Sequence, residues 1–435
     1  MDYKEKVVEW IDSNQLDIAK VLSEMVKIPS VNPFFEDNKD VIYEEKFQEF
    51  LANYLEEMGM NVELWEPNAK ELAKYEGKAG YYEGRDFTNR PNLHGELKGT
   101  GGGKSILLFG HADVVKAGDE WQEDPFGGEI KDGRIYGRGT VDMKGGIAAM
   151  VMAVKAIKES GIKLRGDVYV GSVSDEEAGG MGTLAYVDKG YRADGCIVTE
   201  PTKLNIAPLC RGILWGKLTV LGRAGHIEMD QEDWRTGGAV DAIDKATLFL
   251  EHFKRLNKEW AITKKHPLLP IPCQINIAQF NAGEYPTSYA SKAEIVFNAQ
   301  YLPSEKDENG LGSNVKKEIE DLVMKVANTD PWLQENLPEI QWIVDADCGE
   351  TDYGNPFVQT MEKAALSINN DITVEGLSCH SDMGWLIESG IPTVNFGPGE
   401  PRIAHQADEY VEISKLIEAT KIIALTIINW CGIEE

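Results

Sequence analysis

Histidine and acidic residues recur in short blocks along this chain, each where an apolar run ends. His111 and Asp113 directly follow the run SILLFG, in the block GHADVV. Side chains at positions i and i+2 of a strand end point to the same side, so one can bind a metal while the other supports it. The spacing does not assign that supporting task to Asp113, and a solvent-facing turn is the alternative interpretation.

Asp142 lies among glycines in GRGTVDMKGG, residues 137–146, directly before a predicted helix. A carboxylate at this point could bridge two cations, while the glycines allow close approach of the main chain. The alternative is a helix N-cap, a common task for aspartate.

A cluster of three acidic residues follows the apolar run VYVGSV: Asp175, Glu176 and Glu177 in SVSDEEAGG. Ligands and catalytic groups of open α/β sheets collect at the carboxyl ends of strands. Of two adjacent glutamates, one can hold a metal and the other can take a proton from metal-bound water. A solvated acidic loop is the alternative.

Two later blocks repeat the arrangement. Glu200 ends the apolar run in IVTEPT, and His405 lies beyond another such run in GIPTVNFGPGEPRIAHQADEY. Five potential nitrogen and oxygen ligands at the ends of successive strands indicate a metal site more strongly together than any block does alone.

The elements that must position these residues alternate between strand and helix up to about residue 208. This alternation predicts a largely parallel, mixed sheet flanked by helices. Between residues 209 and 347 the pattern changes to strand, long helix, two strands and helix, which indicates an α+β unit with antiparallel pairing. From residue 348 the first pattern returns, so we expect a domain of residues 1–208 and 348–435 that carries an inserted domain, 209–347.

Length, charge and cysteine usage exclude several classes of protein. A chain of 435 residues is too long for one core. The net charge of -28 repels nucleic acid and anionic membranes. Six cysteines without CxxC spacing and an N-terminal segment without an apolar h-region predict reduced thiols and a cytoplasmic protein.

The ordered blocks resemble the zinc metallopeptidase and deacylase family that includes acetylornithine deacetylase, succinyl-diaminopimelate desuccinylase, aminoacylase and glutamate carboxypeptidase. HADVV, the segment from Trp121 to Gly146, SDEEAGG, TEPT, FGPG and AHQADEY occur in family order over nearly the whole chain. The resemblance implies a zinc-peptidase-like catalytic domain with an inserted ferredoxin-like lid and dimerisation domain.

Carried over by position, the resemblance also implies a role for each residue. One divalent ion would be held by His111 and Glu200 and the other by Glu177 and His405, with Asp142 bridging them, Asp113 orienting His111 and Glu176 acting as general base. The expected cofactor is a pair of zinc ions, with cobalt or manganese as alternatives. A bridging water would attack the scissile carbonyl while Glu176 accepts its proton and later passes it to the leaving amine.

Three further residues bear on substrate and assembly. His226 in GRAGHIEM matches a family histidine that reaches a neighbouring subunit's site and stabilises the oxyanion, so the resemblance implies a homodimer through the inserted domain. Gln300, in NAQYLP, stands where many relatives carry an arginine that grips a substrate carboxylate. Arg402, close to His405, could supply that charge instead.

We therefore expect a di-metal amidohydrolase acting on an N-acyl amino acid or related small molecule, of the acetylornithine deacetylase or succinyl-diaminopimelate desuccinylase type. A dipeptidase or carboxypeptidase, and a deformylase acting on an aminomethyl heterocycle, are alternatives that use the same metals. An alternative of another class is a non-catalytic metal-binding interaction protein. Glu176 argues against that class, because a pure binder needs no base.

Overall fold

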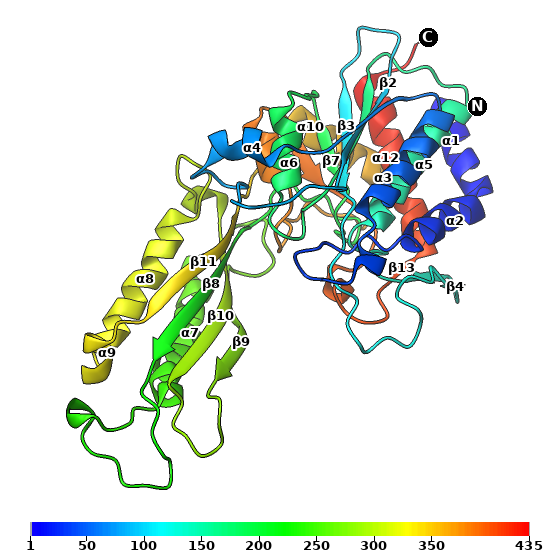
Figure 1. The fold of residues 1–435 in the computed structure, drawn as a ribbon. Helices are drawn as coiled ribbons and strands as arrows, with labels where there is room; N and C mark the ends of the chain where they lie inside the picture. Colours follow the sequence, from blue (N-terminus) through cyan, green and yellow to red (C-terminus); the bar gives the residue numbers. More distant parts are fainter. Residues whose placement is uncertain (1, 435) are drawn as a thin grey trace. The chain divides into compact units, whose positions relative to one another are not determined.

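The computed structural model describes residues 2–434, which form two compact units (Figure 1). The first unit contains the chain up to Cys210, Gly349–Leu377 and the chain from Ser381 onward. The second unit contains Arg211–Cys348 together with Ser378–His380. Sequence patterns did not anticipate that the short segment 378–380 belongs with the inserted unit.

The first unit is built on a six-stranded sheet with the order β1-β2-β6-β3-β7-β12. Its four parallel strands are β6, β3, β7 and β12, while β2 pairs antiparallel with β6 and with β1. The strands are β1 Asn61–Trp65, β2 Asn92–Leu97, β3 Ile106–His111, β6 Val168–Val173, β7 Cys196–Val198 and β12 Thr393–Asn395. All six residues of β3 are buried, as expected for a strand covered on both faces. The predicted largely parallel, mixed sheet is confirmed.

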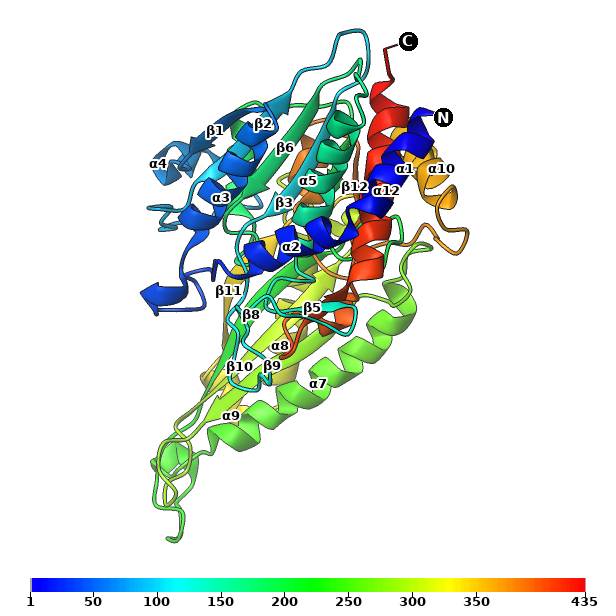
Figure 2. The same cartoon turned by 90° about the vertical axis from the view of Figure 1, so that its right-hand side faces the viewer.

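Helices cover this sheet on both sides. Figure 1 shows α3, α5 and α12 on one side with α1 and α2 outside them, and α6 on the other side; Figure 2 is seen from the side of the first group. The helices are α1 Tyr3–Ser13, α2 Gln15–Val26, α3 Glu44–Glu57, α5 Lys144–Glu159, α6 Met181–Asp188 and α12 Ile413–Cys431. Most residues of α5 and α12 are buried, so these two helices form the core that supports the sheet.

Smaller elements complete the first unit. They are α4 Ala69–Leu72, α10 Pro356–Leu366, α11 Met383–Glu388 and a three-stranded sheet of β4 Ile130–Lys131, β5 Arg134–Tyr136 and β13 Tyr410–Glu412. The start of α10 follows from its sequence, because Asn355 caps the main-chain N–H of Phe357 and Pro356 occupies the first helical position.

The second unit has the element order βαββαβ, the α+β arrangement expected for the inserted region. Its antiparallel sheet has the order β11-β8-β10-β9. The elements are β8 Gly212–Leu221, α7 Ala242–Thr263, β9 Ile275–Ala282, β10 Lys292–Tyr301, α8 Ser313–Ala327, α9 Pro331–Glu335 and β11 Glu339–Ala346. Buried residues alternate along β8 and β10, so one face of the sheet packs on α7 while the other stays open.

The start of the long helix is set by a capping residue. The helix α7 begins at Ala242, because the Asp241 side chain accepts the N–H of Ile243 and caps the helix there. Gly237 has a φ of 112°, a left-handed conformation that ends the preceding turn.

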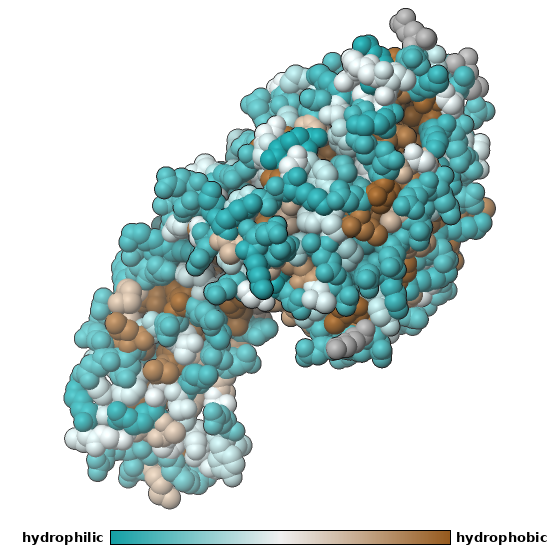
Figure 3. Space-filling model, turned by 45° about the horizontal axis from the view of Figure 1, so that its top comes forward, coloured by the Kyte–Doolittle hydropathy of each residue, from teal (hydrophilic) through white to brown (hydrophobic). Residues whose placement is uncertain are grey.

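The surface drawn in Figure 3 is mostly hydrophilic, with apolar residues in separate small spots. Within residues 2–434, no helix has both the length and the apolar character needed to cross a membrane.

Candidate metal centre

The five predicted ligands lie together at one edge of the first unit's sheet. His111 is the last residue of β3, while Glu177 and Glu200 follow β6 and β7, the strands that pair in parallel with β3. Parallel strands bring their carboxyl ends to the same edge, which explains why residues so distant in sequence meet here. Asp142 comes from the segment before α5, and His405 from the segment before β13.

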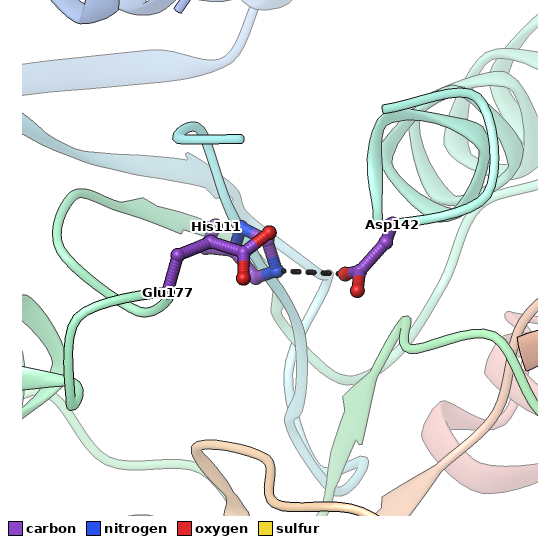
Figure 4. Close-up of side chains that lie close together, drawn as sticks. All are labelled: His111, Asp142 and Glu177. Atoms are coloured by element: carbon purple, nitrogen blue, oxygen red, sulfur yellow. Dashed lines mark hydrogen bonds and ion pairs between the residues drawn. The ribbon is translucent and has the colours of Figure 1, made fainter. Parts of the chain in front are cut away.

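Asp142 lies between the two histidines. Its Oδ1 is 3.2 Å from Nε2 of His111, and its Oδ2 is 3.3 Å from Nε2 of His405 (Figure 4 shows the His111 side). The Asp142 side chain does not cap α5, whose N-cap is Met143. One carboxylate with an imidazole on each oxygen has the geometry that a group bridging two cations requires.

The glutamates surround this pair of histidines. Oε2 of Glu177 is 3.3 Å from His405 Nε2, and Oε1 of Glu200 is 3.8 Å from His111 Nε2. Potential ligand atoms of His111, Asp142 and Glu177 all lie within 4.8 Å of one another. Glu176 also reaches this space, with Oε2 3.7 Å from His111 Nε2.

These side chains fit a divalent cation. Oε1 of Glu177 is buried and has no hydrogen-bond partner among the described residues, so it retains an unused lone pair inside the site. His111 Nδ1 lies 2.8 Å from the main-chain oxygen of Asp113, which requires a proton on Nδ1, and Nε2 faces Asp142, where it would become the ligand atom once a cation replaces its proton. Imidazole and carboxylate donors suit zinc, cobalt and manganese.

The site concentrates negative charge. Burial, together with the neighbouring carboxylates, raises the pKa values of Glu176 and Glu200 well above their usual range, and burial also raises the pKa of Glu177. Burial opposes ionisation of Asp142 too, but hydrogen bonds from His111 and His405 lower its pKa overall. The charge of Glu177 raises the pKa of His405 well above its usual value. A site of this kind attracts protons or cations.

Asp113 holds the turn that carries the two glutamates. Its carboxylate is fully buried and accepts the main-chain N–H groups of Glu176 at 3.2 Å and Glu177 at 3.1 Å, as well as the Asn32 side-chain amide at 2.8 Å. The nearest carboxylate oxygen is 3.7 Å from His111 Nδ1. The main-chain oxygen of Asp113 therefore orients His111. The carboxylate of Asp113 holds the turn after β6 that carries Glu176 and Glu177.

A second buried carboxylate supports the same turn. Asp175 precedes the glutamates, has a left-handed φ of 72°, and forms ion pairs with Arg85 at 3.0 Å and Arg90 at 3.1 Å. Arg90 also pairs with the buried Glu44. Sequence analysis did not identify the two arginines, because nothing in their local sequence marks an ion pair with a residue about 85 positions away.

Another pair missed by sequence analysis connects two ligand segments. Arg138 and Glu409, both buried, form an ion pair. Glu409 accepts the main-chain N–H of Asp142 at 3.3 Å, and Arg138 donates to the main-chain oxygen of His405 at 3.3 Å. Arg138 lies in the block GRGTVDMKGG and Glu409 in the block AHQADEY, but their sequence context did not indicate that they form a pair.

The remaining predicted residues lie elsewhere. Arg402 is exposed in the turn Pro401–Ile403 of the first unit. In the second unit, His226 is exposed in the segment after β8. Gln300 lies on β10, where its side-chain oxygen accepts from Arg211 at 2.9 Å and its amide donates to Ser378.

The site combines imidazole and carboxylate groups around a shared aspartate with a further glutamate beside them. Such a set of side chains is typical of the active site of a metal-dependent hydrolase that acts on amide bonds. The sequence profile of Peptidase family M20/M25/M40 matches residues 107–429, and the chain belongs to this family. The enzymes of this family are di-metal hydrolases.

Individual relatives agree with this assignment. The chain is 32% identical over 407 residues to N-formyl-4-amino-5-aminomethyl-2-methylpyrimidine deformylase of Bacillus subtilis (strain 168), which covers 89% of this chain and 90% of the relative. It is 30% identical over 353 residues to the probable succinyl-diaminopimelate desuccinylase of Staphylococcus aureus (strain MRSA252), covering 74% and 82%. The structure of the di-peptidase Dug1p from Saccharomyces cerevisiae has the same fold, with a TM-score of 0.74 at 15% identity over 99% of both chains.

Proposed function

We propose that this enzyme binds two divalent cations and removes the acyl group from a small N-acyl compound, with Glu176 as the general base. His111 and Glu200 would hold one cation and Glu177 and His405 the other, with Asp142 shared between them. The observation that carries this proposal is the position of Asp142, with one oxygen toward each histidine. Zinc is the expected ion, with cobalt and manganese as alternatives.

Bound in this way, the cations lower the pKa of water and polarise the amide carbonyl. Glu176 accepts the proton of the attacking water and donates it to the leaving amine. Burial raises the pKa of Glu176, which strengthens its carboxylate as a base and keeps its acid form available for the second transfer. Asp113 keeps Glu176 in place through the Glu176 main-chain N–H.

For the substrate, we propose a formamide on an aminomethyl heterocycle. The alignment with the deformylase relative covers 89% of this chain, compared with 74% for the desuccinylase relative. Gln300 also favours a substrate without the carboxylate that an arginine would grip, because its amide carries no charge and its N–H already donates to the main-chain oxygen of Ser378. Removal of an acyl group from an amino acid is the second candidate, supported by the desuccinylase relative.

A substrate panel separates these candidates. The zinc- or cobalt-loaded enzyme would be given N-formyl-4-amino-5-aminomethyl-2-methylpyrimidine, N-succinyl and N-acetyl amino acids, and dipeptides. We expect the highest kcat/KM for the formamide. A preference for the succinyl compound would transfer the proposal to the second candidate, and no turnover of any compound would contradict enzymatic function.

Adjacent glutamates provide a matched pair of variants. We expect Glu176→Gln to lower kcat by about 10²- to 10⁴-fold while the protein keeps both cations, because it loses only proton transfer. Glu177→Gln should lose bound metal. If Glu176→Gln lost metal as well, the roles of base and ligand would have been confused.

We further propose a cytoplasmic homodimer formed through the second unit, with His226 reaching the partner's site. β9, Ile275–Ala282, lies at the edge of its sheet, contains no charged residue and is largely exposed, so its free main-chain groups can pair with a second copy. A lysine on β9, as in Ala278→Lys, should shift the mass in light scattering from dimer to monomer. A fully active wild-type monomer would contradict both the dimer and the role of His226.

A further inference from the structure

We propose that Arg138 and Glu409 are a positioning pair that sets the separation of Asp142 and His405, and thereby allows the second cation to bind. The proposal rests on the di-metal function proposed above. Neither side chain belongs to the ligand set, and each contacts the main chain of a different ligand segment.

Glu409 fixes the segment that carries the bridging residue. Its carboxylate is fully buried, and Oε1 accepts the main-chain N–H of Val141 at 2.8 Å and of Asp142 at 3.3 Å. Its own main-chain oxygen accepts the N–H of Gly137 at 2.9 Å. Hydrogen bonds to an ionised acceptor are shorter and stronger than neutral ones, and the 2.8 Å bond to Val141 has this length, so the carboxylate holds the main chain directly before Asp142.

Arg138 fixes the segment that carries His405. The terminal nitrogen Nη1 pairs with Glu409, and the terminal nitrogen Nη2 donates to the main-chain oxygens of His405 at 3.3 Å and Ala117 at 3.2 Å. His405 has a left-handed φ of 64°, a conformation that few non-glycine residues adopt. The Arg138 guanidinium contacts the carbonyl of this residue.

General stability is a weak reason for such a pair. Burying two charges costs desolvation free energy that their attraction only partly returns, so apolar replacements are often neutral or stabilising. Here the two residues of the pair are 271 positions apart in the sequence. Glu409 contacts the segment of Asp142, and Arg138 contacts the segment of His405. The planar guanidinium can donate in two directions at once, which a lysine ammonium at the same position does not reproduce.

Cobalt titration of the full-length, metal-free protein tests the proposal. The variants are Glu409→Gln, which keeps the shape and loses the charge, and Arg138→Lys, which keeps the charge and loses the fork. A matched control is Lys421→Met, which removes an ion pair with Asp12 at 2.6 Å in the same unit, between α12 and α1. Calorimetry gives the stoichiometry and affinity of Co²⁺, and the visible absorption of bound Co²⁺ reports its coordination.

We expect both variants to bind the second Co²⁺ about 10- to 100-fold more weakly than wild type, with altered absorption, as for other residues that orient ligands. Lys421→Met should bind as wild type does. The double variant should be no weaker than the weaker single variant, because the two residues act as one unit. Penalties that add in full would contradict a joint action.

Three results distinguish the possible failures. Unchanged Co²⁺ affinities in both variants, with only a lower melting temperature, would overturn the positioning role and leave the di-metal function intact. Wild-type protein that binds fewer than two Co²⁺ would overturn the di-metal function itself. If Glu409→Gln did not fold, Arg138→Lys and Glu409→Asp would carry the same test, since both keep a charged pair.

Discussion

The conservative substitution Asp113→Asn separates two roles for this residue. If the carboxylate mainly orients His111, the change should weaken the binding of the cation that His111 is proposed to hold. If it mainly holds the turn of Glu176 and Glu177, the change should loosen that turn. The contacts favour the second role, because both main-chain N–H groups of the turn donate to this carboxylate while His111 uses the main-chain oxygen.

The size of the effect follows from these hydrogen bonds. An asparagine oxygen in the place of Oδ2 can still accept from Glu177 and Asn32, but its amide nitrogen then faces the N–H of Glu176. One buried N–H left without an acceptor costs about 1–3 kcal/mol, and the remaining bonds lose their charge assistance. A total of about 3 kcal/mol against the native turn corresponds to a loss of about 100-fold in kcat/KM.

Two measurements test this prediction in parallel. Hydrogen exchange followed by mass spectrometry should show faster exchange in the peptide that contains residues 174–178, and kinetics of the metal-loaded enzyme should show the loss in kcat/KM. Asn32→Ala serves as a control that removes one donor and leaves both main-chain bonds to Asp113 in place. Normal exchange in this turn, combined with weaker binding of one metal, would refute the reasoning. The main role of the Asp113 carboxylate would then be to orient His111.

Three further perturbations have defined outcomes. Chelation should lower the melting temperature more at pH 8.5 than at pH 6. The pKa of His405 is raised in the fold, so its protonated form stabilises the metal-free protein fully below about pH 6.5, and this contribution is lost as the pH rises. An equal drop in melting temperature at both pH values would contradict this prediction. His94, whose pKa burial lowers from 6.5 to about 4, should destabilise the fold by at most roughly 3 kcal/mol as the pH falls through this window, since only the unfolded chain takes up the proton. Urea unfolding of wild type and His94→Gln at pH 7 and pH 4.5 measures this contribution, and identical pH dependence of the two proteins would exclude it. Gln300→Arg should destabilise the protein by about 2–4 kcal/mol in thermal or urea unfolding, because it removes one of the three acceptors of the buried Arg211 and adds a like charge, whereas Gln300→Met should cost less.

The meeting of His111, Glu177 and Glu200 could be predicted because each lies at or just beyond the end of a strand with a strong local signal. The apolar runs of β3 and β6 are buried strands in the structure, so His111 and Glu177 are brought to one edge by the same pattern that forms the sheet. The same holds for Glu200 after β7. Here the information needed for the site lies within a few residues of each ligand.

Elements with a weak local signal were missed. β2 has the sequence NLHGEL, with a histidine and a glycine inside it, and it is stabilised by pairing on both sides with β1 and β6. In this strand tertiary pairing, rather than hydrophobic alternation, decides the structure.

The supporting residues of the site were harder to predict for a different reason. Asp113 was expected to orient His111, and in the structure the main-chain oxygen of Asp113 makes that contact while its carboxylate holds a turn some 60 residues later. A sequence records that an aspartate stands at this position, and every residue type there has the same main-chain oxygen. Whether the main-chain oxygen or the carboxylate faces the histidine depends on the position of the N–H groups of Glu176 and Glu177 after β6. The carboxylate turns toward these donors. The role of Asp113 therefore depends on how the sheet is paired, and the pairing of Arg138 with Glu409 likewise depends on the fold, because the two residues are 271 positions apart.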